Sequence, residues 1–342
     1  MSKLISKLKR RYVAVTFFIL GLAMALGIVW SNILPKGLPS AAGSTASQVP
    51  YDSSSSFEIK RLDWYKNIKP VISVEPKHES EGMLAKKEVL NTLISDLEKE
   101  GLASQISVYF RNASTAEWLS INGDVKYHPA SLMKVPLMLA ILKMAEENPS
   151  LLKQSIEFQP DPVVPFEEQF FKDKTLEAGK SYTVHDLIFY SIAYSDNFAT
   201  QVLSKHVDVA KAKSLFEALG LQVPAPNDPA YLLSANEYSM FIKSIFNSTF
   251  LSPEYSEYGA EMMVNCNFKE GFAKGFPTGT KMWHKYGEWS SPGADAELHE
   301  SGVVFIKDKP YILTVMTRGK DQKKLAQAIK KIAENLGSTH LP

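Results

Sequence analysis

Hydrophobic residues follow helical and strand periodicities in a regular order along the first half of the chain. Apolar residues recur at helical spacing over 84–99, and Gly101 can end the helix that this spacing predicts. Apolar and polar residues then alternate over 106–110, and 118–121 forms a second predicted strand. A helical stretch follows over 131–147. The pattern therefore predicts one helix, a strand pair and a second helix.

The second half of the chain continues with helices and returns to strands. Residues 183–246 are mainly helical by pattern, and the Thr183 hydroxyl can cap the first of these helices. Three strands are then predicted, at 281–289, 299–307 and 311–317, before an amphipathic helix at 322–336. This order predicts an α+β fold, an α/β/α sandwich in which an antiparallel sheet is flanked by the N- and C-terminal helices and carries a separate all-helical lobe.

A long apolar run lies behind a basic tail at the N-terminus. Residues 1–11 contain five Lys and Arg residues, and 12–34 contain no charged residue. A helix that crosses a bilayer needs roughly 20 apolar residues, whereas the core of a cleavable signal peptide has about 7–15. We therefore expect a transmembrane anchor at 12–34, and cleavage near 41–46 stays open. The basic flank places the N-terminus in the cytoplasm and the rest of the chain outside the cell membrane.

The composition changes again before the folded part of the chain. Residues 35–81 are rich in Ser, Pro, Gly and Ala and include the serine run 53–56, so we expect a linker there. Residues 82–342 would then form one extracytoplasmic folded domain.

Charge and cysteine content exclude several classes of function. Lys and Arg total 38 against 37 Asp and Glu, so the net charge of +1 gives no general basis for binding nucleic acid. Cys266 is the only cysteine, which excludes an intrachain disulfide and a cysteine-based metal site. We expect no metal and no cofactor, and the sequence leaves the oligomeric state open.

Ser131 and Lys134 form a candidate pair of nucleophile and base. Their separation puts a hydroxyl and an amine on one helical face. A serine hydroxyl is a weak nucleophile until a base takes its proton, and a lysine can do so if burial or nearby positive charge lowers its pKa. The pattern is common, and Ser6 and Lys9 repeat it in the basic tail. Alone, Ser131 could equally be a helix-capping serine.

Two later segments carry groups that suit the same chemistry. Ser195-Asp196-Asn197 follows a predicted helix end and is either an ordinary turn or a source of a proton relay, Ser195, and a substrate-orienting amide, Asn197. Lys285 lies on a predicted strand and can hold a substrate carboxylate, while Gly287 lets a substrate approach the backbone. The N–H groups of Ser131 and Glu288 could then form an oxyanion hole.

Together these three segments resemble the Ser-x-x-Lys, Ser-Asp-Asn and Lys-Thr-Gly motifs of class A β-lactamases and penicillin-binding proteins. Residues 182–187, 275–287 and 300–304 also resemble that family, and the likeness covers about 84–336. It implies a β-lactamase/transpeptidase-like fold and a serine hydrolase that acts on β-lactams or on peptidoglycan stem peptides.

The resemblance also implies a role for each motif residue. Ser131 attacks a β-lactam or D-alanyl-D-alanine carbonyl, and Lys134 takes its proton. Ser195 delivers a proton to the departing nitrogen, Asn197 binds the acylamido side chain, and Lys285 faces the substrate carboxylate.

The chain departs from the family pattern at two places. No Glu-x-x-x-Asn pattern for activating the deacylating water occurs between 216 and 240, and from Ala218 onward Asp228 is the only carboxylate before Glu237. Tyr286 stands where the family has Thr or Ser, and strand alternation puts it on the face opposite to Lys285. We therefore keep two alternatives to a β-lactamase-like hydrolase: a D,D-peptidase that releases β-lactams slowly, and a catalytically degenerate envelope-binding module.

Overall fold

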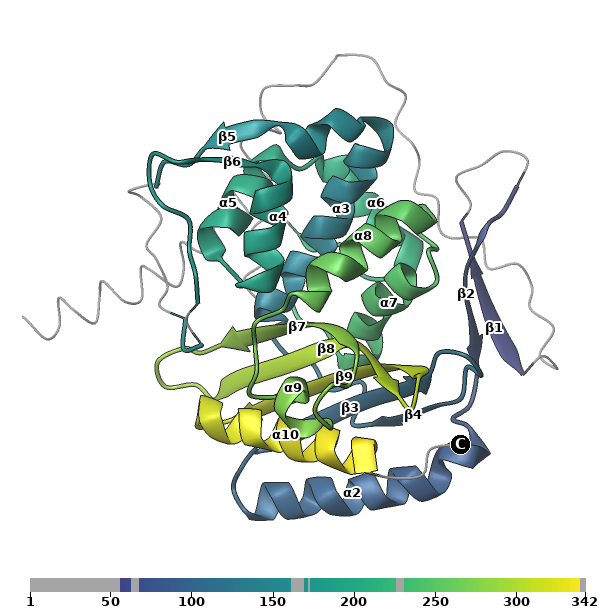
Figure 1. Ribbon diagram of the computed structural model, residues 1–342. Coiled ribbons are helices and arrows are strands. Elements are labelled where there is room, and N and C mark those ends of the chain that lie inside the picture. The colour runs from purple at the N-terminus through teal and green to yellow at the C-terminus, as the bar shows by residue number, and fades with distance from the viewer. Residues whose placement is uncertain (1–55, 63–67, 161–168, 172, 226–230, 339–342) are drawn as a thin grey trace, which may run out of the picture.

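A five-stranded antiparallel sheet organises the computed structural model, which describes residues 56–62, 68–160, 169–171, 173–225 and 231–338. The strand order is β4-β3-β9-β8-β7, so β7 forms one edge. The strands are β3 (Gln105–Asn112), β4 (Trp118–Ile121), β7 (Met282–Trp289), β8 (Ala296–Ile306) and β9 (Lys309–Gly319). The sheet lies between two helices on one face and a helical lobe on the other (Figure 1).

One face of the sheet packs against the first and last helices of the described chain, α2 (Leu84–Lys99) and α10 (Gln322–Ser338). In α10 the buried residues Leu325, Ile329, Ile332 and Leu336 follow helical spacing and form a single apolar stripe. Every second residue of β9 points to these helices, because side chains alternate between the two faces of a strand. This face thus forms a core of its own.

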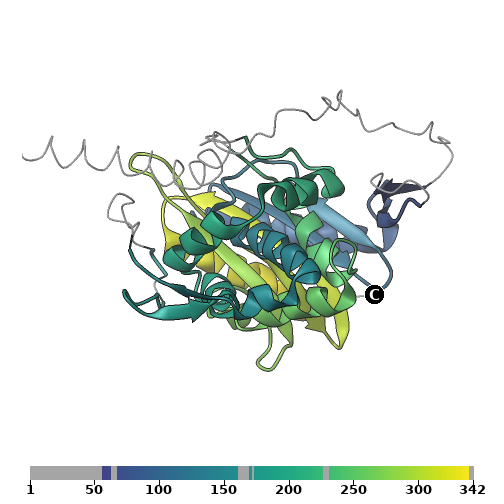
Figure 2. The same ribbon diagram turned by 90° about the horizontal axis from the view of Figure 1, so that it is seen from above.

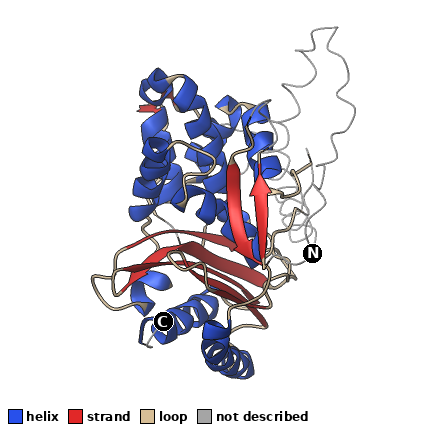
Figure 3. Ribbon diagram, turned by 90° about the vertical axis from the view of Figure 1, so that its right-hand side faces the viewer, coloured by secondary structure: helices blue, strands red, loops and turns tan. Residues whose placement is uncertain are grey.

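The opposite face carries the helical lobe (Figures 2 and 3). Its helices are α3 (Lys134–Glu147), α4 (Val184–Ala193), α5 (Asn197–His206), α6 (Val209–Leu219), α7 (Ala235–Phe246) and α8 (Pro253–Val264). Short elements connect them to each other and to the sheet: η2 (Ala130–Met133), η3 (Pro149–Lys153), the paired strands β5 (Ser155–Glu157) and β6 (Ser181–Thr183), and α9 (Phe272–Gly275). Thr183 caps α4 in a capping box with Asp186, as its sequence position predicts.

The predicted architecture of antiparallel sheet, flanking terminal helices and helical lobe is confirmed. No helix in the described ranges is long and apolar enough to cross a membrane. The tail and anchor predicted at 1–34 lie outside the described residues.

The linker predicted over 35–81 is wrong for its C-terminal part. Strands β1 (Phe57–Arg61) and β2 (Val71–Pro76) form an antiparallel hairpin, and η1 (Glu81–Met83) leads directly into α2. Glu75 pairs with Arg111 of β3 and with Lys243 of α7, whose Nζ lies 3.2 Å from Glu75 Oε1. The hairpin is therefore fastened to both the sheet and the lobe (Figure 3).

We expect Glu75→Ala to lower the free energy of unfolding by about 3 kcal/mol, because it leaves two buried cations without their counter-ion. Urea denaturation of the full chain measures this change. The control is Lys99→Ala, which breaks an exposed pair with Asp96 and should cost less than about 1 kcal/mol. Equal effects of the two substitutions would contradict the structural role given to the hairpin.

Candidate active site

Ser131 lies at the start of the lobe, in the 3₁₀ turn η2 that continues directly into α3. Its side chain is half-buried, and the preceding Ala130 has a left-handed φ of 48°. A non-glycine residue adopts that conformation only where its surroundings impose it. The turn is thus held in a specific shape by its neighbours.

The edge strand β7 is one of those neighbours. A Cβ atom added at Gly287 would lie 2.8 Å from Leu132 N and 2.9 Å from Pro129 O. Only glycine permits this approach of two backbones. Gly287 therefore brings β7 against the turn that carries Ser131, although the sequence had suggested a role in substrate approach.

Lys134, one turn after Ser131, is buried in the junction between lobe and sheet. Its Nζ donates hydrogen bonds to Ser195 O, to Ser195 Oγ at 3.2 Å and to Asn197 Oδ1 at 2.8 Å. Burial, together with the positive charge of Lys285, holds the pKa of Lys134 well below its ordinary value. An amine that loses its proton easily can serve as a general base.

The Ser195-Asp196-Asn197 turn connects α4 to α5 and is held by hydrogen bonds to the Asp196 side chain. Ser195 has a left-handed φ of 55°, and Asp196 caps α5 by accepting a hydrogen bond from Ala199 N. Asp196 also accepts a hydrogen bond from Thr175 Oγ1. The sequence left Asp196 without a role, although an aspartate just before a helix is typical of an N-cap.

Lys285 extends from β7 toward the lobe and is completely buried. Its Nζ donates a hydrogen bond to Tyr286 O at 2.9 Å and lies 4.3 Å from the centre of the Tyr286 ring. Burial lowers the pKa of Lys285 to about 8. The side chain is therefore enclosed by the protein, and its predicted role of facing a substrate carboxylate stays a prediction.

Tyr286 lies on the other face of β7 from Lys285, as strand alternation requires, and the same alternation gives Glu288 the face of Tyr286. The Tyr286 ring stacks on Phe268 with centroids 4.4 Å apart, and its hydroxyl donates to Phe171 O at 3.1 Å. Phe171 N donates in turn to Glu288 Oε2 at 3.2 Å. Gln169 Nε2 donates to Ser195 O at 2.9 Å. Residues 169–171 thus join the Ser195 turn to β7, a link that no sequence pattern had indicated.

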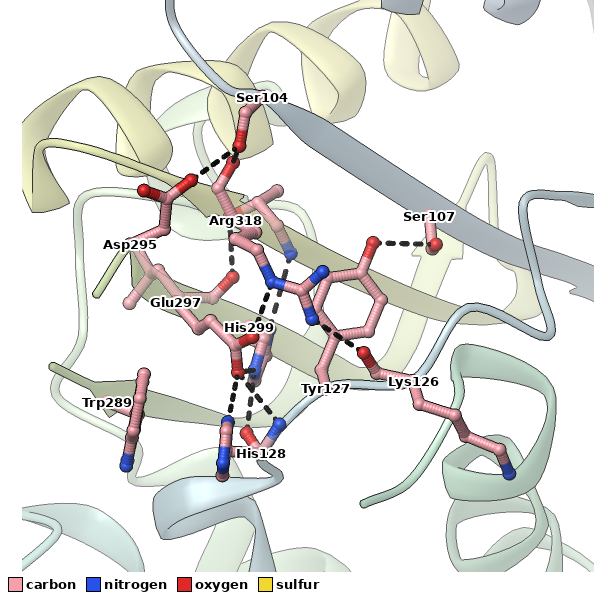
Figure 4. A network of polar contacts seen from close by, with 12 residues as sticks. Ser104, Ser107, Lys126, Tyr127, His128, Trp289, Asp295, Glu297, His299 and Arg318 are labelled. Atoms are coloured by element: carbon pink, nitrogen blue, oxygen red, sulfur yellow. Dashed lines mark hydrogen bonds and ion pairs between the residues drawn. The ribbon is translucent and has the colours of Figure 1, made fainter. Parts of the chain in front are cut away.

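A polar network anchors the segment that leads to Ser131 (Figure 4). Glu297, which is 2% exposed, accepts hydrogen bonds from His128 N at 2.8 Å and from Arg318 Nε at 2.7 Å. His299 Nε2 lies 2.9 Å from His128 O, so it can donate a hydrogen bond to that carbonyl. The His128 ring stacks on Trp289 with centroids 4.0 Å apart. These residues position the backbone three residues before Ser131, and the sequence analysis missed them.

The arrangement therefore places the turn of Ser131, Lys134, Ser195, Asn197 and the strand of Lys285, Gly287 and Glu288 at one junction. The sequence model of the β-lactamase enzyme family matches residues 86–339, which is most of the chain. The chain belongs to this family.

Relatives within the family are distant. The β-lactamase VEB-1 of Pseudomonas aeruginosa is 28% identical over 102 residues, which are 30% of this chain and 34% of that protein. The chain thus matches about a third of that relative's length.

Solved structures share the fold over a longer stretch. PBP-A is 20% identical, with a TM-score of 0.57 over 72% of this chain and 95% of its own. A β-lactamase from Chitinophaga pinensis is 15% identical, with a TM-score of 0.63 over 72% of this chain and 97% of its own. A β-lactamase from Xanthomonas campestris is 17% identical, with a TM-score of 0.59 over 72% and 96%.

The sequence analysis finds no Glu-x-x-x-Asn pattern in the connection between α6 and α7. The connection from α6 to α7 spans 220–234, and its described part, 220–225 and 231–234, contains no Asp or Glu. Asp228 lies outside the described residues. The described ranges also contain no group of three or more His, Cys, Asp or Glu that could hold a metal ion.

We expect Gly287→Ala to slow the reaction of Ser131 with a fluorophosphonate by about a hundredfold, because the added methyl must push β7 away from η2. Intact-mass spectrometry over time measures the rate. The control is Gly259→Ala in α8, where the nearest atom, Leu142 Cδ1, is 3.4 Å away and the rate should not change. A normal rate in Gly287→Ala would show that the close approach does not shape the site.

Proposed function

We propose that this member of the β-lactamase family is an exported serine acyl-hydrolase in which a β-lactam or a D-alanyl-D-alanine-type amide acylates Ser131. The observation that carries the proposal is the buried Lys134 amine, which lies one turn from Ser131 and bonds to Ser195 and Asn197. A buried lysine with a lowered pKa at the start of the nucleophile's helix is the base that serine needs.

The contacts support a specific division of labour. Ser131 Oγ attacks the carbonyl carbon, its proton passes to Lys134 Nζ, and the oxyanion accepts hydrogen bonds from the N–H groups of Ser131 and Glu288. Lys134 then returns the proton through Ser195 Oγ, 3.2 Å away, to the leaving nitrogen as the C–N bond breaks. Asn197 uses Oδ1 to accept from Lys134, so its amide N–H₂ is left for a carbonyl of the substrate side chain.

Release of the acyl group lacks an identified base in this scheme. The described part of the connection 220–234 offers no carboxylate to activate water. This favours a second candidate within the same family, a D,D-peptidase that β-lactams acylate and leave only slowly. The expected anchor at 12–34 would place either enzyme outside the cell membrane, next to peptidoglycan.

We expect a β-lactam to add once to each parent chain, at Ser131, and the adduct to persist long after it forms. Ser131→Ala should give no adduct, whereas Ser290→Ala, which changes an exposed serine near the end of β7, should react like the parent. Intact-mass and peptide-mass spectrometry read both results. Rapid multiple turnover would favour a β-lactamase over a peptidase, and the lack of any adduct would favour the degenerate binding module.

The positive charge of Lys285 should influence how the acylation rate depends on pH. Acylation needs neutral Lys134, so its rate should rise with pH through the lowered pKa of Lys134 and then level off. Lys285→Met removes a charge that lowers the pKa of Lys134, and the rising limb should therefore move to higher pH.

The control for this prediction is Lys281→Met, which removes an exposed charge next to the same strand. It should not change the pH at which the acylation rate rises. Acylation rates of the three proteins across a pH series provide the measurement. An unmoved limb in Lys285→Met would mean that Lys134 is not the titrating base.

A further inference from the structure

Cys266, His284 and Glu300 form a buried cluster of ionisable side chains that the proposed acylation at Ser131 does not use. Cys266 follows α8, His284 lies on the edge strand β7, and Glu300 lies on the neighbouring strand β8. None of the three is more than 2% exposed. A thiol, an imidazole and a carboxyl group are thus enclosed together next to β7.

His284 lies between the other two members of the cluster. Its Nδ1 is 2.7 Å from Glu300 Oε1, and its ring shares a hydrogen bond with the Cys266 thiol. Glu300 Oε2 accepts a hydrogen bond from Phe272 N at 2.8 Å, which fixes the carboxylate. In this order the carboxylate orients the imidazole, and the imidazole holds the proton of a nucleophile.

The charges in the cluster favour the thiolate form of Cys266. Burial alone would raise the pKa of Cys266, but the charge of His284 and their shared hydrogen bond lower it below its ordinary value. Burial would lower the pKa of His284, but Cys266 and Glu300 raise it to about 10. Lys285 adds a second positive charge that acts on Cys266. A thiolate beside an imidazolium follows, and the thiolate is the nucleophilic form of cysteine.

A cavity borders this cluster on the side of α8. Its volume is about 590 Å³, and Cys266 and His284 both contribute to its wall, with Val264 and Met282 beside them. Cys266 itself has no exposed surface. The cavity therefore gives a route to the thiol for a reagent close to water in size, and bulky thiol reagents are excluded.

We propose that Cys266, His284 and Glu300 form a second reactive site, at which a small peroxide that enters from this cavity oxidises Cys266 to a sulfenic acid. The thiolate sulfur attacks one peroxide oxygen, and an S–O bond forms as the O–O bond breaks. The departing oxygen takes a proton from His284 and leaves as water, or as an alcohol when the peroxide is organic. Sulfur is oxidised and the peroxide is reduced. This inference goes beyond the proposed function, because neither Ser131 nor Lys134 takes part.

Hydrogen peroxide tests the proposal on the full chain, with an excess of a cyclic 1,3-diketone to trap the sulfenic acid. Intact mass follows the addition of one diketone, and peptide mass locates it at Cys266, the only cysteine of the chain. At pH 6 less than about 1% of free cysteine is thiolate. A paired thiolate gains from this difference and loses part of the gain to its enclosure, so we expect the parent to react about tenfold faster than free cysteine.

Two substitutions remove the support for the thiolate. His284→Gln removes the cation next to the sulfur and should slow adduct formation about a hundredfold. Glu300→Gln keeps the side-chain size but removes the counter-charge of His284, and should slow it about tenfold. His206→Gln is the matched control, because it changes an exposed histidine on α5 and should react like the parent.

A parent that reacts no faster than free cysteine would overturn the proposal, and so would an unchanged rate in Glu300→Gln. A parent rate that climbs steeply at low urea concentrations would also overturn it, because the thiol would then react only in the unfolded chain. Glu300→Gln preserves side-chain shape, so it decides the matter even if His284→Gln fails to fold. The readout does not depend on acylation of Ser131, and failure of one proposal leaves the other intact.

Discussion

The burial of one amine, Lys134 Nζ, constrains the rest of this structure. An ammonium group without water around it must find acceptors in the protein, and these come from the turn between α4 and α5. The sheet side of the junction contributes a second lysine, Lys285, which also has no exposed surface. Two enclosed amines need hydrogen-bond acceptors in the protein, and Asp196 and Glu288 supply negative charge to Lys134. The lobe and the sheet are thus joined by electrostatic requirements as well as by apolar packing.

This requirement explains why several small features occur together. The left-handed backbone at Ser195 aims its carbonyl at Lys134, and the cap of Asp196 on α5 holds the turn in that shape. Gly287 lets β7 approach the turn of Ser131. Each feature is modest alone, but loss of one would displace the hydrogen-bond acceptors of Lys134 Nζ, an amine that has no access to water.

Much of the fold could be predicted because it depends on local patterns. The helix at 84–99 and the strand at 118–121 match α2 and β4 to the residue, and the Thr183 cap follows from its own chemistry. The hairpin β1–β2 could not be predicted, since Glu75 finds Arg111 and Lys243 only in the folded chain. In the site, the three sequence motifs identified the residues that meet at the junction. Strand alternation predicted that Lys285 and Tyr286 lie on opposite faces of β7. The enclosure of Lys285 by Tyr286 and the links made by residues 169–171 arise from tertiary contacts without a sequence signature.

The pairing of β3 with β9 has a consequence for the time course of folding. β3 is made early in synthesis and pairs on one side with β4, which follows it closely, but its other partner is β9, the last strand of the described chain, so that Gln105 lies opposite Arg318. Arg318 and Glu297 also fix the backbone before Ser131, so Ser131 is held in place only when these late segments have arrived. Contacts this distant along the chain are slow to form. The newly made chain therefore contains Ser131 before the contacts that position it have formed.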